Sequence, residues 1–351
     1  MADPLVRSKA PKAFRPAKAT AKPVAKARKT SKPKAGSRAA PETHAKSDGY
    51  IPFRERFRAW WHGVEPAAVV KKGQKAKTNF TKRLIELDDK GDLPPQADWG
   101  AARTRICEQV WGRGLVGPGG GTYAIDNARP FSKRSESLVL DLSAGLGGRI
   151  AEIARDPDVS ITGMERDPEF ADMAVERMKQ LDRQNIRSMS DFNPERLDLA
   201  GIKYDCILAR EAFFTVEDKL ALLGILRNGL RQKGTLSFTD FVLAEPDQNE
   251  GTVMDEWHDS EPLTPKPWSL EEYRSVLTSL NLNVTELEDD SDYYRELVLH
   301  AWRNYVDGLE DITFDRTIVD ALMQEAQLWL HRVRALESGQ LCLMRVFARL
   351  R

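Results

Sequence analysis

Metal-binding and disulfide-forming residues are scarce in this sequence. Its 351 residues include three cysteines, Cys107, Cys206 and Cys342, and five histidines. The cysteines lie far apart and form no Cys-x-x-Cys pair, which argues against both a disulfide framework and a zinc site. No cluster of histidine, cysteine and acidic residues has the spacing of metal ligands. We therefore predict no metal dependence and a reducing, cytoplasmic compartment.

Long apolar runs are also missing. No stretch approaches the roughly 18 consecutive apolar residues that a membrane-spanning helix needs. The N-terminus lacks the apolar centre of a secretory signal. The hydrophobic content of 41% is still enough to build the core of one large domain or two small ones. The composition therefore predicts a folded protein without a membrane span.

Large apolar side chains and acids are rare at the N-terminus. Residues 1–48 carry 13 Lys and Arg against three Asp and Glu, so this tail is +10 and the remainder of the chain is −10. Such a segment cannot bury enough surface to offset its ordering entropy, so we predict that it is disordered. It could bind an anionic partner, such as nucleic acid, a membrane surface or the acidic remainder of the chain. A merely solubilising extension is the alternative.

The rest of the chain is predicted to form two parts. Residues 49–130 contain aromatic residues at helical spacing, a second helical pattern over 99–111 and the glycine-rich stretch "GRGLVGPGG". We predict that they form a helical cap followed by a lid over a ligand. Residues 131–351 alternate between apolar runs and helical patterns, which is typical of a parallel α/β sheet.

The predicted fold is a seven-stranded, mostly parallel, doubly wound α/β sheet with helices on both faces. The apolar runs predict strands at 137–142, 159–164, 186–189, 204–209, 234–242, 282–288 and 340–348. The helical patterns of this part fall at 147–155, 168–183, 217–231, 269–280, 291–309 and 314–336.

The stretch "VLDLSAGLGGRIAEIA", residues 139–154, predicts a strand, a tight turn and a helix. In open α/β sheets ligands bind beyond the carboxyl ends of the strands, so this turn lies where a ligand is expected. A phosphate-binding P-loop is excluded because Arg149 and Ile150 follow the glycines in place of Lys and Ser or Thr. The glycines also fail to match the dinucleotide pattern Gly-x-Gly-x-x-Gly. A purely structural turn remains the alternative.

Acidic residues end each of the first three predicted strands of this sheet. Asp141 follows the first apolar run, Glu165 ends the second and Asp191 ends the third. A carboxylate at the position of Glu165 can accept both hydroxyls of a ribose, and Asp191 is placed to accept from the amine of adenine. Three acids repel phosphates and suit a neutral or cationic nucleoside. This pattern favours S-adenosylmethionine, which joins adenosine to a sulfonium cation.

Five segments then resemble the class I S-adenosylmethionine-dependent methyltransferases. They are "VLDLSAGLGG", "GMERDP", "SDFNP", "YDCILAREAFFTVEDK" and "LRQKGTLSFTDFVL", spanning roughly residues 137–243. The resemblance implies that the cofactor is S-adenosylmethionine. It also implies a set of cofactor-binding residues: Asp141, Ser143, Gly145, Gly147, Glu165, Arg166, Asp191, Phe192 and Arg210. Ser143 stands where that family usually has glycine.

The acceptor is predicted to be a small molecule that carries an amine. The sequence has no [DN]PP[YF] tetrapeptide after the fourth strand and no Pro-Cys nucleophile, which argues against adenine, glutamine and pyrimidine-C5 methylation. "LAREAFFTVEDK" and the region after residue 267 resemble amine N-methyltransferases of the phosphoethanolamine and sarcosine types. Thr215 stands where those enzymes often have histidine.

The same resemblance suggests Arg210, Glu211 and Tyr293 as catalytic residues. Aromatic rings stabilise a desolvated cation and carboxylates neutralise it. The further candidates for an amine pocket are Tyr294, Phe213, Trp257 and Trp268, with Asp240 and Asp289 as additional acids. Two alternatives remain: a methyltransferase for protein or nucleic acid that is tethered by the basic tail, and a non-catalytic S-adenosylmethionine-binding protein.

Overall fold

The computed structural model describes the chain from residue 53 onward, with gaps. Every described residue belongs to the unit Asp48–Arg351. The predicted disordered tail, residues 1–48, lies outside the described residues. The described ranges are 53–61, 96–118, 120, 136–181, 183–245, 247, 249–309 and 316–351.

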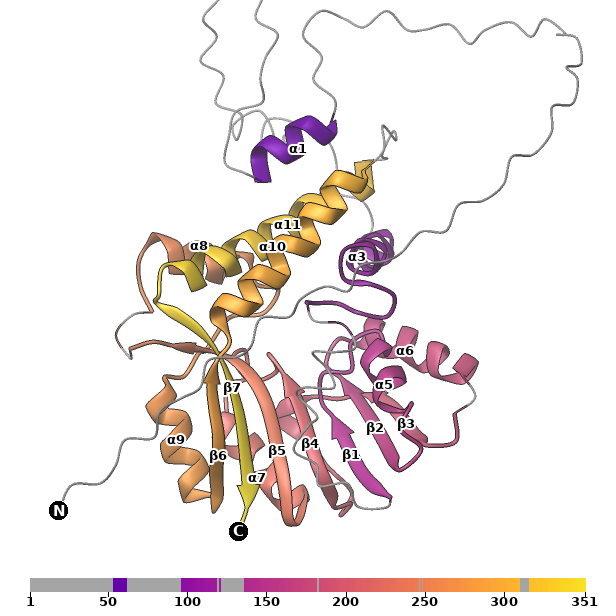
Figure 1. The fold of residues 1–351 in the computed structure, drawn as a ribbon, viewed down its shortest axis with the longest axis vertical. Helices are drawn as coiled ribbons and strands as arrows, with labels where there is room; N and C mark the ends of the chain where they lie inside the picture. The colour runs from indigo at the N-terminus through magenta and orange to yellow at the C-terminus, as the bar shows by residue number, and fades with distance from the viewer. Residues whose placement is uncertain are drawn as a thin grey trace, which may run out of the picture. The chain divides into compact units, whose positions relative to one another are not determined.

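Seven strands form one sheet in the order β3-β2-β1-β4-β5-β7-β6. The strands are β1 (Ser137–Asp141), β2 (Val159–Glu165), β3 (Ile186–Asp191), β4 (Tyr204–Arg210), β5 (Leu230–Leu243), β6 (Leu282–Asp289) and β7 (Leu341–Leu350). Only β7 runs antiparallel to its neighbours, β5 and β6. The predicted fold class is confirmed, and the predicted strands agree with these bounds to within a few residues (Figure 1).

Alternate residues of β1 show why both faces of the sheet are covered. Leu138 and Leu140 belong to a core shared with helices α7 (Lys219–Gly229) and α9 (Leu270–Ser279). Val139, on the opposite face, belongs to a second core built with α5 (Gly148–Ile153) and α6 (Pro168–Leu181). Side chains alternate across a strand, so a continuous apolar run is the pattern of a strand buried on both faces.

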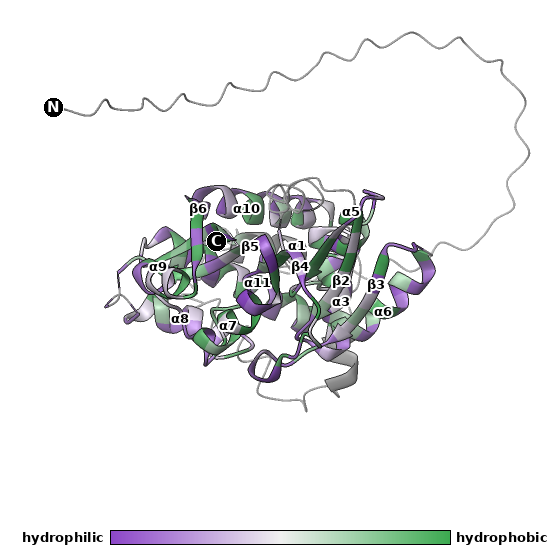
Figure 2. Cartoon of the chain, turned by 90° about the horizontal axis from the view of Figure 1, so that it is seen from below, coloured by the Kyte–Doolittle hydropathy of each residue, from purple (hydrophilic) through white to green (hydrophobic). Residues whose placement is uncertain are grey.

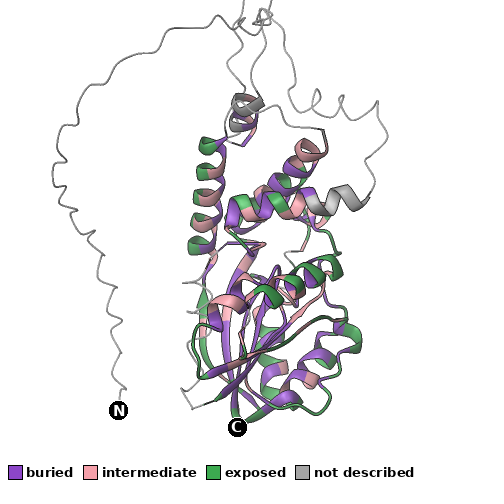
Figure 3. Ribbon diagram, turned by 90° about the vertical axis from the view of Figure 1, so that its right-hand side faces the viewer, coloured by how far each residue is buried: buried purple, intermediate pink, exposed green. Residues whose placement is uncertain are grey.

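A helical layer packs against the ends of β5 and β7. It consists of α1 (Phe53–Trp61), α3 (Gln96–Trp111), α8 (Thr252–Ser260), α10 (Ser291–Gly308) and α11 (Arg316–Glu337). These helices share one apolar core with Phe241 and Leu243 of β5 and with Leu341 and Leu343 of β7. Figure 3 shows the strands and the inner sides of these helices buried. This helical layer, called the cap below, therefore lies at the carboxyl ends of the parallel strands.

The cap helices are amphipathic, as their sequence spacing predicts. On α10 the buried residues Tyr294, Val298, Trp302 and Val306 are four positions apart, so they share one face. Figure 2 shows α10 and α6 with hydrophilic and hydrophobic residues on different sides. Helix α8 was not among the predicted elements. None of the described helices combines the length and the apolar composition that crossing a bilayer requires.

Candidate active site

The chain order of the sheet reverses at β1 and β4. From β1 the chain continues to β2 and β3 on one side, and it later returns to β4 on the other side. The carboxyl ends of two strands that diverge in this way form the expected ligand site of an open α/β sheet. The glycine turn between β1 and α5 lies at this switch point.

The glycine turn has two features that depend on glycine. Gly145 and Gly147 have φ angles of 56° and 85°, a region that favours glycine. Gly148 has a different reason, because a Cβ there would lie 2.7 Å from the carbonyl oxygen of Gly114. Ser143 is not among the described residues with positive φ. Serine in place of the usual glycine therefore introduces no left-handed strain into this turn.

The Ser143 hydroxyl joins three elements of the fold. It donates to Asp141 Oδ1 at 3.1 Å and accepts from Arg149 Nη2 at 2.7 Å and from the Arg210 amide at 2.8 Å. These contacts connect the end of β1, the first turn of α5 and the end of β4. Ser143 therefore links the glycine turn to the end of β4, the strand paired with β1.

Asp141 is fully buried and is neutralised from within the chain. Arg149 Nη2 donates to both of its oxygens, at 3.0 and 3.1 Å, and the amide and hydroxyl of Ser143 donate to Oδ1. Oδ1 thus accepts three of these hydrogen bonds and Oδ2 accepts one. The predicted contact between Asp141 and the cofactor remains a prediction. Asp141 supports the turn through Arg149 and Ser143.

We expect Arg149→Met to lower the free energy of unfolding by about 3–5 kcal/mol, because it leaves the Asp141 carboxylate buried without its partner. Chemical denaturation of the full chain measures this. The matched control is Arg155→Met, whose side chain is 67% exposed and pairs with Glu152 on the surface. The control should change stability by less than about 1 kcal/mol. Equal denaturation midpoints for wild type and Arg149→Met would contradict this account.

Glu165 and Asp191 end β2 and β3 in register, and their Cα atoms are paired. Glu165 Oε2 accepts from the Gly145 amide at 2.6 Å, and Oε1 accepts from the Asp167 amide at 3.0 Å. Burial raises the pKa of Glu165, and these backbone hydrogen bonds oppose the rise. Asp191 is exposed. The amide of the next residue, Phe192, donates to the Glu165 carbonyl oxygen at 3.1 Å.

Arg166 extends from the end of β2 toward the loop that follows β4. Its Nη1 donates to Thr215 Oγ1 at 2.7 Å. Burial lowers the pKa of Arg166, while Glu195 and Glu165 oppose this effect. Thr215, which stands where the resembling enzymes often have histidine, thus bonds to the residue that directly follows β2.

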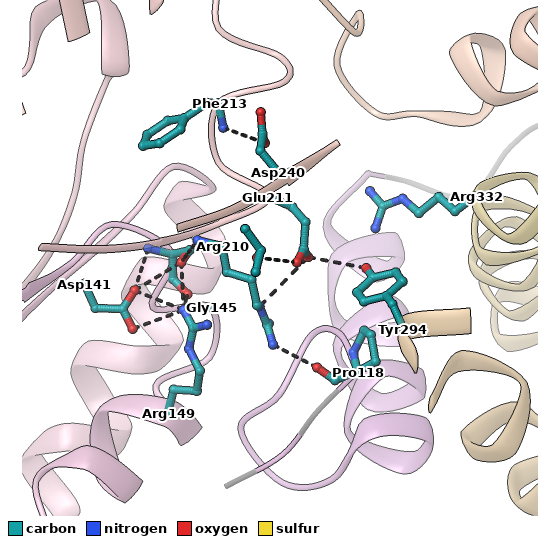
Figure 4. Close-up of polar contacts among 12 residues, drawn as sticks. Pro118, Asp141, Gly145, Arg149, Arg210, Glu211, Phe213, Asp240, Tyr294 and Arg332 are labelled. Carbon is teal, nitrogen blue, oxygen red and sulfur yellow. Dashed lines mark hydrogen bonds and ion pairs between the residues drawn. The ribbon is translucent and has the colours of Figure 1, made fainter. Parts of the chain in front are cut away.

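Glu211 follows β4 in an unusual conformation. Its φ angle is 43°, which is rare for a residue with a Cβ and is often found at functional sites. Glu211 Oε1 accepts from Thr239 Oγ1 at 3.0 Å, and Oε2 accepts from the Tyr294 hydroxyl at 3.4 Å. Arg210 Nε lies 3.9 Å from Oε2. The carboxylate is therefore held by residues of β4, β5 and α10 beneath the cap (Figure 4).

The two tyrosines at the start of α10 have different environments. Tyr294 is fully buried and reaches Glu211, while Tyr293 is 51% exposed. The structure thus brings Tyr294 to Glu211, and the catalytic role of Tyr293 remains a prediction. Consecutive helix residues point about 100° apart, so only one member of the pair can face the site. In the sequence, the four-residue spacing of Tyr294 with Val298 and Trp302 indicates that Tyr294 is the buried member of the pair.

Residues 112–118 contact the glycine turn directly. The Gly148 amide donates to the Gly114 carbonyl at 2.9 Å, and Arg210 Nη1 donates to the Pro118 carbonyl at 2.9 Å. A Cβ on Gly117 would lie 3.4 Å from both Arg210 and Trp329. This segment includes the stretch predicted to be a lid, and it connects the turn with the cap.

The ion pair of Arg332 was not predicted from the sequence, because its partner Glu261 is 71 residues away. Arg332 donates to both oxygens of Glu261 at 2.6 Å, and its guanidinium lies 4.7 Å from the ring centre of Trp329 and 5.5 Å from that of Phe241. Figure 4 shows it on the Tyr294 side of Glu211. No local motif marks such a residue within a long helix.

Several predicted pocket residues instead stabilise the core. Phe213 packs against Phe238, and Trp268 packs against Tyr273. Asp240 is fully buried and accepts from the amides of Phe213 and Phe214 and from the Tyr273 hydroxyl. Burial raises the pKa of Asp240 to about 7. This carboxylate therefore anchors the loop after β4, which carries Glu211.

The raised pKa of Asp240 predicts a pH-dependent stability. In the unfolded chain an aspartate titrates near pH 4, so between about pH 4 and pH 7 the native state binds more protons. The associated stability is complete below the unfolded pKa and is lost as the pH rises through about 7. Relative to Asp240→Asn, the wild type should lose up to about 1.4 kcal/mol per pH unit in this range.

Denaturation between pH 4 and pH 8 measures this difference. Asp292→Asn is the control, because that side chain is 94% exposed. Parallel stability curves for wild type and Asp240→Asn would contradict the prediction.

Comparison with known proteins agrees with this geometry. Residues 140–236, from β1 into β5, match the family model described as a methyltransferase domain. The chain contains a class I, S-adenosylmethionine-dependent methyltransferase domain. S-adenosylmethionine is the cofactor of this family. The predicted family and cofactor are thus confirmed.

Individual relatives are distant. The chain is 25% identical over 205 residues to phosphoethanolamine N-methyltransferase of Plasmodium falciparum, a match that covers 55% of this chain and 71% of that protein. It is 27% identical over 159 residues to an O-methyltransferase of Pyrenophora dematioidea, covering 45% of this chain and 59% of that one.

A solved structure has the same fold as this methyltransferase. Phosphoethanolamine N-methyltransferase 2 of Haemonchus contortus, in complex with phosphomonomethylethanolamine and S-adenosylhomocysteine, is similar with a TM-score of 0.62 at 15% identity. The match covers 71% of this chain and 56% of that one. At this identity the likeness concerns the fold.

Proposed function

We propose that this methyltransferase transfers a methyl group to the nitrogen of a small amine. The observation that carries the proposal is the carboxylate of Glu211. It is only about one-tenth exposed, it has a strained backbone, and it is held at the switch point by Thr239 and Tyr294. A carboxylate held in this way can bind an ammonium group and accept its proton.

The residues at the sheet edge have hydrogen-bonding groups and charges that match the ribose, the adenine and the methionine carboxylate of the cofactor. Each oxygen of Glu165 accepts one backbone hydrogen bond, which leaves lone pairs for the two ribose hydroxyls. Asp191 at the neighbouring strand end would accept from the adenine amine, with Phe192 beside it. Arg210, at the glycine turn, would pair with the methionine carboxylate. When bound, S-adenosylmethionine supplies an electrophilic methyl group on its sulfonium.

The role of the protein in methyl transfer is mainly alignment and exclusion of water. An amine must lose its proton before its nitrogen can attack a methyl group. Glu211 would accept that proton at Oε2, the oxygen that lies nearest to Tyr294 and Arg210. Tyr294, donating to the same oxygen, would keep the carboxylate aimed toward the cap. Trp329 and the buried rings around it would stabilise the ammonium form of the acceptor before deprotonation.

The cap favours a small acceptor over a macromolecule. Trp329, Tyr294 and Phe241 are buried, and the Arg332–Glu261 ion pair beside them is buried as well. A side chain of a folded protein or a base of a duplex would have to displace this layer. The named activity of the P. falciparum relative also supports a small amine. The P. dematioidea relative, an O-methyltransferase, makes a hydroxyl acceptor the alternative.

An acceptor screen on the full chain tests the proposal. We expect labelled methyl transfer from S-adenosylmethionine to a member of a panel of small primary, secondary and tertiary amines. Label found only in hydroxyl compounds, or only in added nucleic acid or protein, would contradict it. With the accepted amine, Glu211→Gln should lower kcat/KM by about 10²- to 10⁴-fold, because the proton acceptor is lost.

Affinity for S-adenosylhomocysteine should be the same in Glu211→Gln and wild type, since Glu211 is assigned to the acceptor. Glu217→Gln is the matched control in the same loop, with a side chain that is 74% exposed, and it should keep wild-type kcat/KM. Full activity of Glu211→Gln would remove Glu211 from the mechanism.

A further inference from the structure

The hydrogen bond between Arg166 and Thr215 crosses the switch point. Arg166 directly follows β2, and Thr215 lies in the loop after β4. These strands are not neighbours, because β1 lies between them. Adjacent strands are about 4.8 Å apart, so the two strand ends are separated by about 10 Å. The hydrogen bond therefore joins two segments that lie on either side of β1, the strand from which the glycine turn begins.

The Thr215 hydroxyl is connected to the end of β2 and not to Glu211. It accepts from Arg166 Nη1 at 2.7 Å, whereas Glu211 is held by Thr239 and Tyr294. Thr215 is therefore connected to the strand end that carries Glu165, the expected ribose ligand. This arrangement differs from a role in amine deprotonation, which would require Thr215 to contact Glu211 or the acceptor.

The Arg166 guanidinium has one hydrogen bond to Thr215 and two acidic residues nearby. Thr215 fixes Nη1, and the charges of Glu195 and Glu165 act on the group. In the described part of the chain, the cation–ring contacts involve Arg103, Lys219 and Arg332, and none places an aromatic ring over Arg166. A guanidinium group is planar, and guanidinium planes stack on nucleobases.

We propose that Thr215 is a positioning residue that orients the Arg166 guanidinium so that it stacks on the adenine ring of the bound cofactor. The inference rests on the proposed cofactor site at Glu165 and Asp191, and it adds a function for Thr215. The position at which the resembling amine methyltransferases often have histidine would thus contribute to cofactor binding in this protein.

Calorimetric titration of S-adenosylhomocysteine into the full chain tests the proposal. Thr215→Val removes the hydroxyl and keeps the shape, so the dissociation constant should rise by about five- to tenfold, as expected for one charge-assisted hydrogen bond. Thr215→Ser keeps a hydroxyl and should restore most of the affinity. Adenosine, which lacks the methionine part, should show the same pattern as a second probe. Thr278→Val on the exposed side of α9 is the control and should bind like wild type.

A double-mutant cycle tests whether Thr215 acts through Arg166. Arg166→Met should weaken binding at least as much as Thr215→Val, and Thr215→Val should have no further effect in the Arg166→Met background. Additive effects would overturn the proposal. Unchanged affinity in Thr215→Val would also overturn it, and tighter binding would show that Arg166 obstructs the site instead.

The wild-type titration separates failure of this inference from failure of the proposed cofactor site. If wild type binds neither probe, the cofactor site itself is wrong and the inference falls with it. If wild type binds and Thr215→Val changes kcat or its pH profile with no change in affinity, Thr215 acts on the acceptor and only the positioning role is overturned.

Discussion

The buried ion pair between Asp141 and Arg149 determines the geometry of this end of the sheet. The chain order of the sheet reverses at β1 and β4, and the glycine turn between β1 and α5 lies at this point. Arg149 neutralises Asp141, and Ser143 connects both residues to the amide that ends β4. Gly145, four residues after Asp141, then lies within hydrogen-bonding distance of Glu165. The glycine turn is thus hydrogen-bonded to Glu165 on one side and, on the other, to the end of β4, which directly precedes Glu211.

Such a pair need not add much net stability. Burying two charges costs desolvation energy that their attraction only partly returns, and removal of one partner is what destabilises the protein. The benefit is geometric, because Arg149 and Ser143 together donate four hydrogen bonds that fix the position of the carboxylate. A serine in place of the usual glycine is therefore compatible with the turn. This position does not need the positive φ that glycine permits, and the serine hydroxyl joins three elements.

The fold followed from the sequence because the strands are continuous apolar runs between helical patterns. Glu165 and Asp191 could be placed at the sheet edge for the same reason, since the carboxyl ends of parallel strands lie together. Contacts between distant segments could not be predicted. The Arg332–Glu261 pair, the Arg166–Thr215 contact and the neutralisation of Asp141 depend on which side chains meet after folding. Which of Tyr293 and Tyr294 faces the protein interior depends on the register of the helix. The four-residue spacing of apolar residues after Tyr294 indicates that register.

The most direct test of the account is calorimetric titration of S-adenosylhomocysteine into the full 351-residue chain, beside Glu165→Ala and the exposed control Glu169→Ala. The account predicts binding by wild type and by Glu169→Ala, with an affinity at least about tenfold weaker for Glu165→Ala, because two hydrogen bonds to the ribose are lost. Absence of wild-type binding, or equal affinity in Glu165→Ala, would contradict the assignment of this sheet edge as the cofactor site.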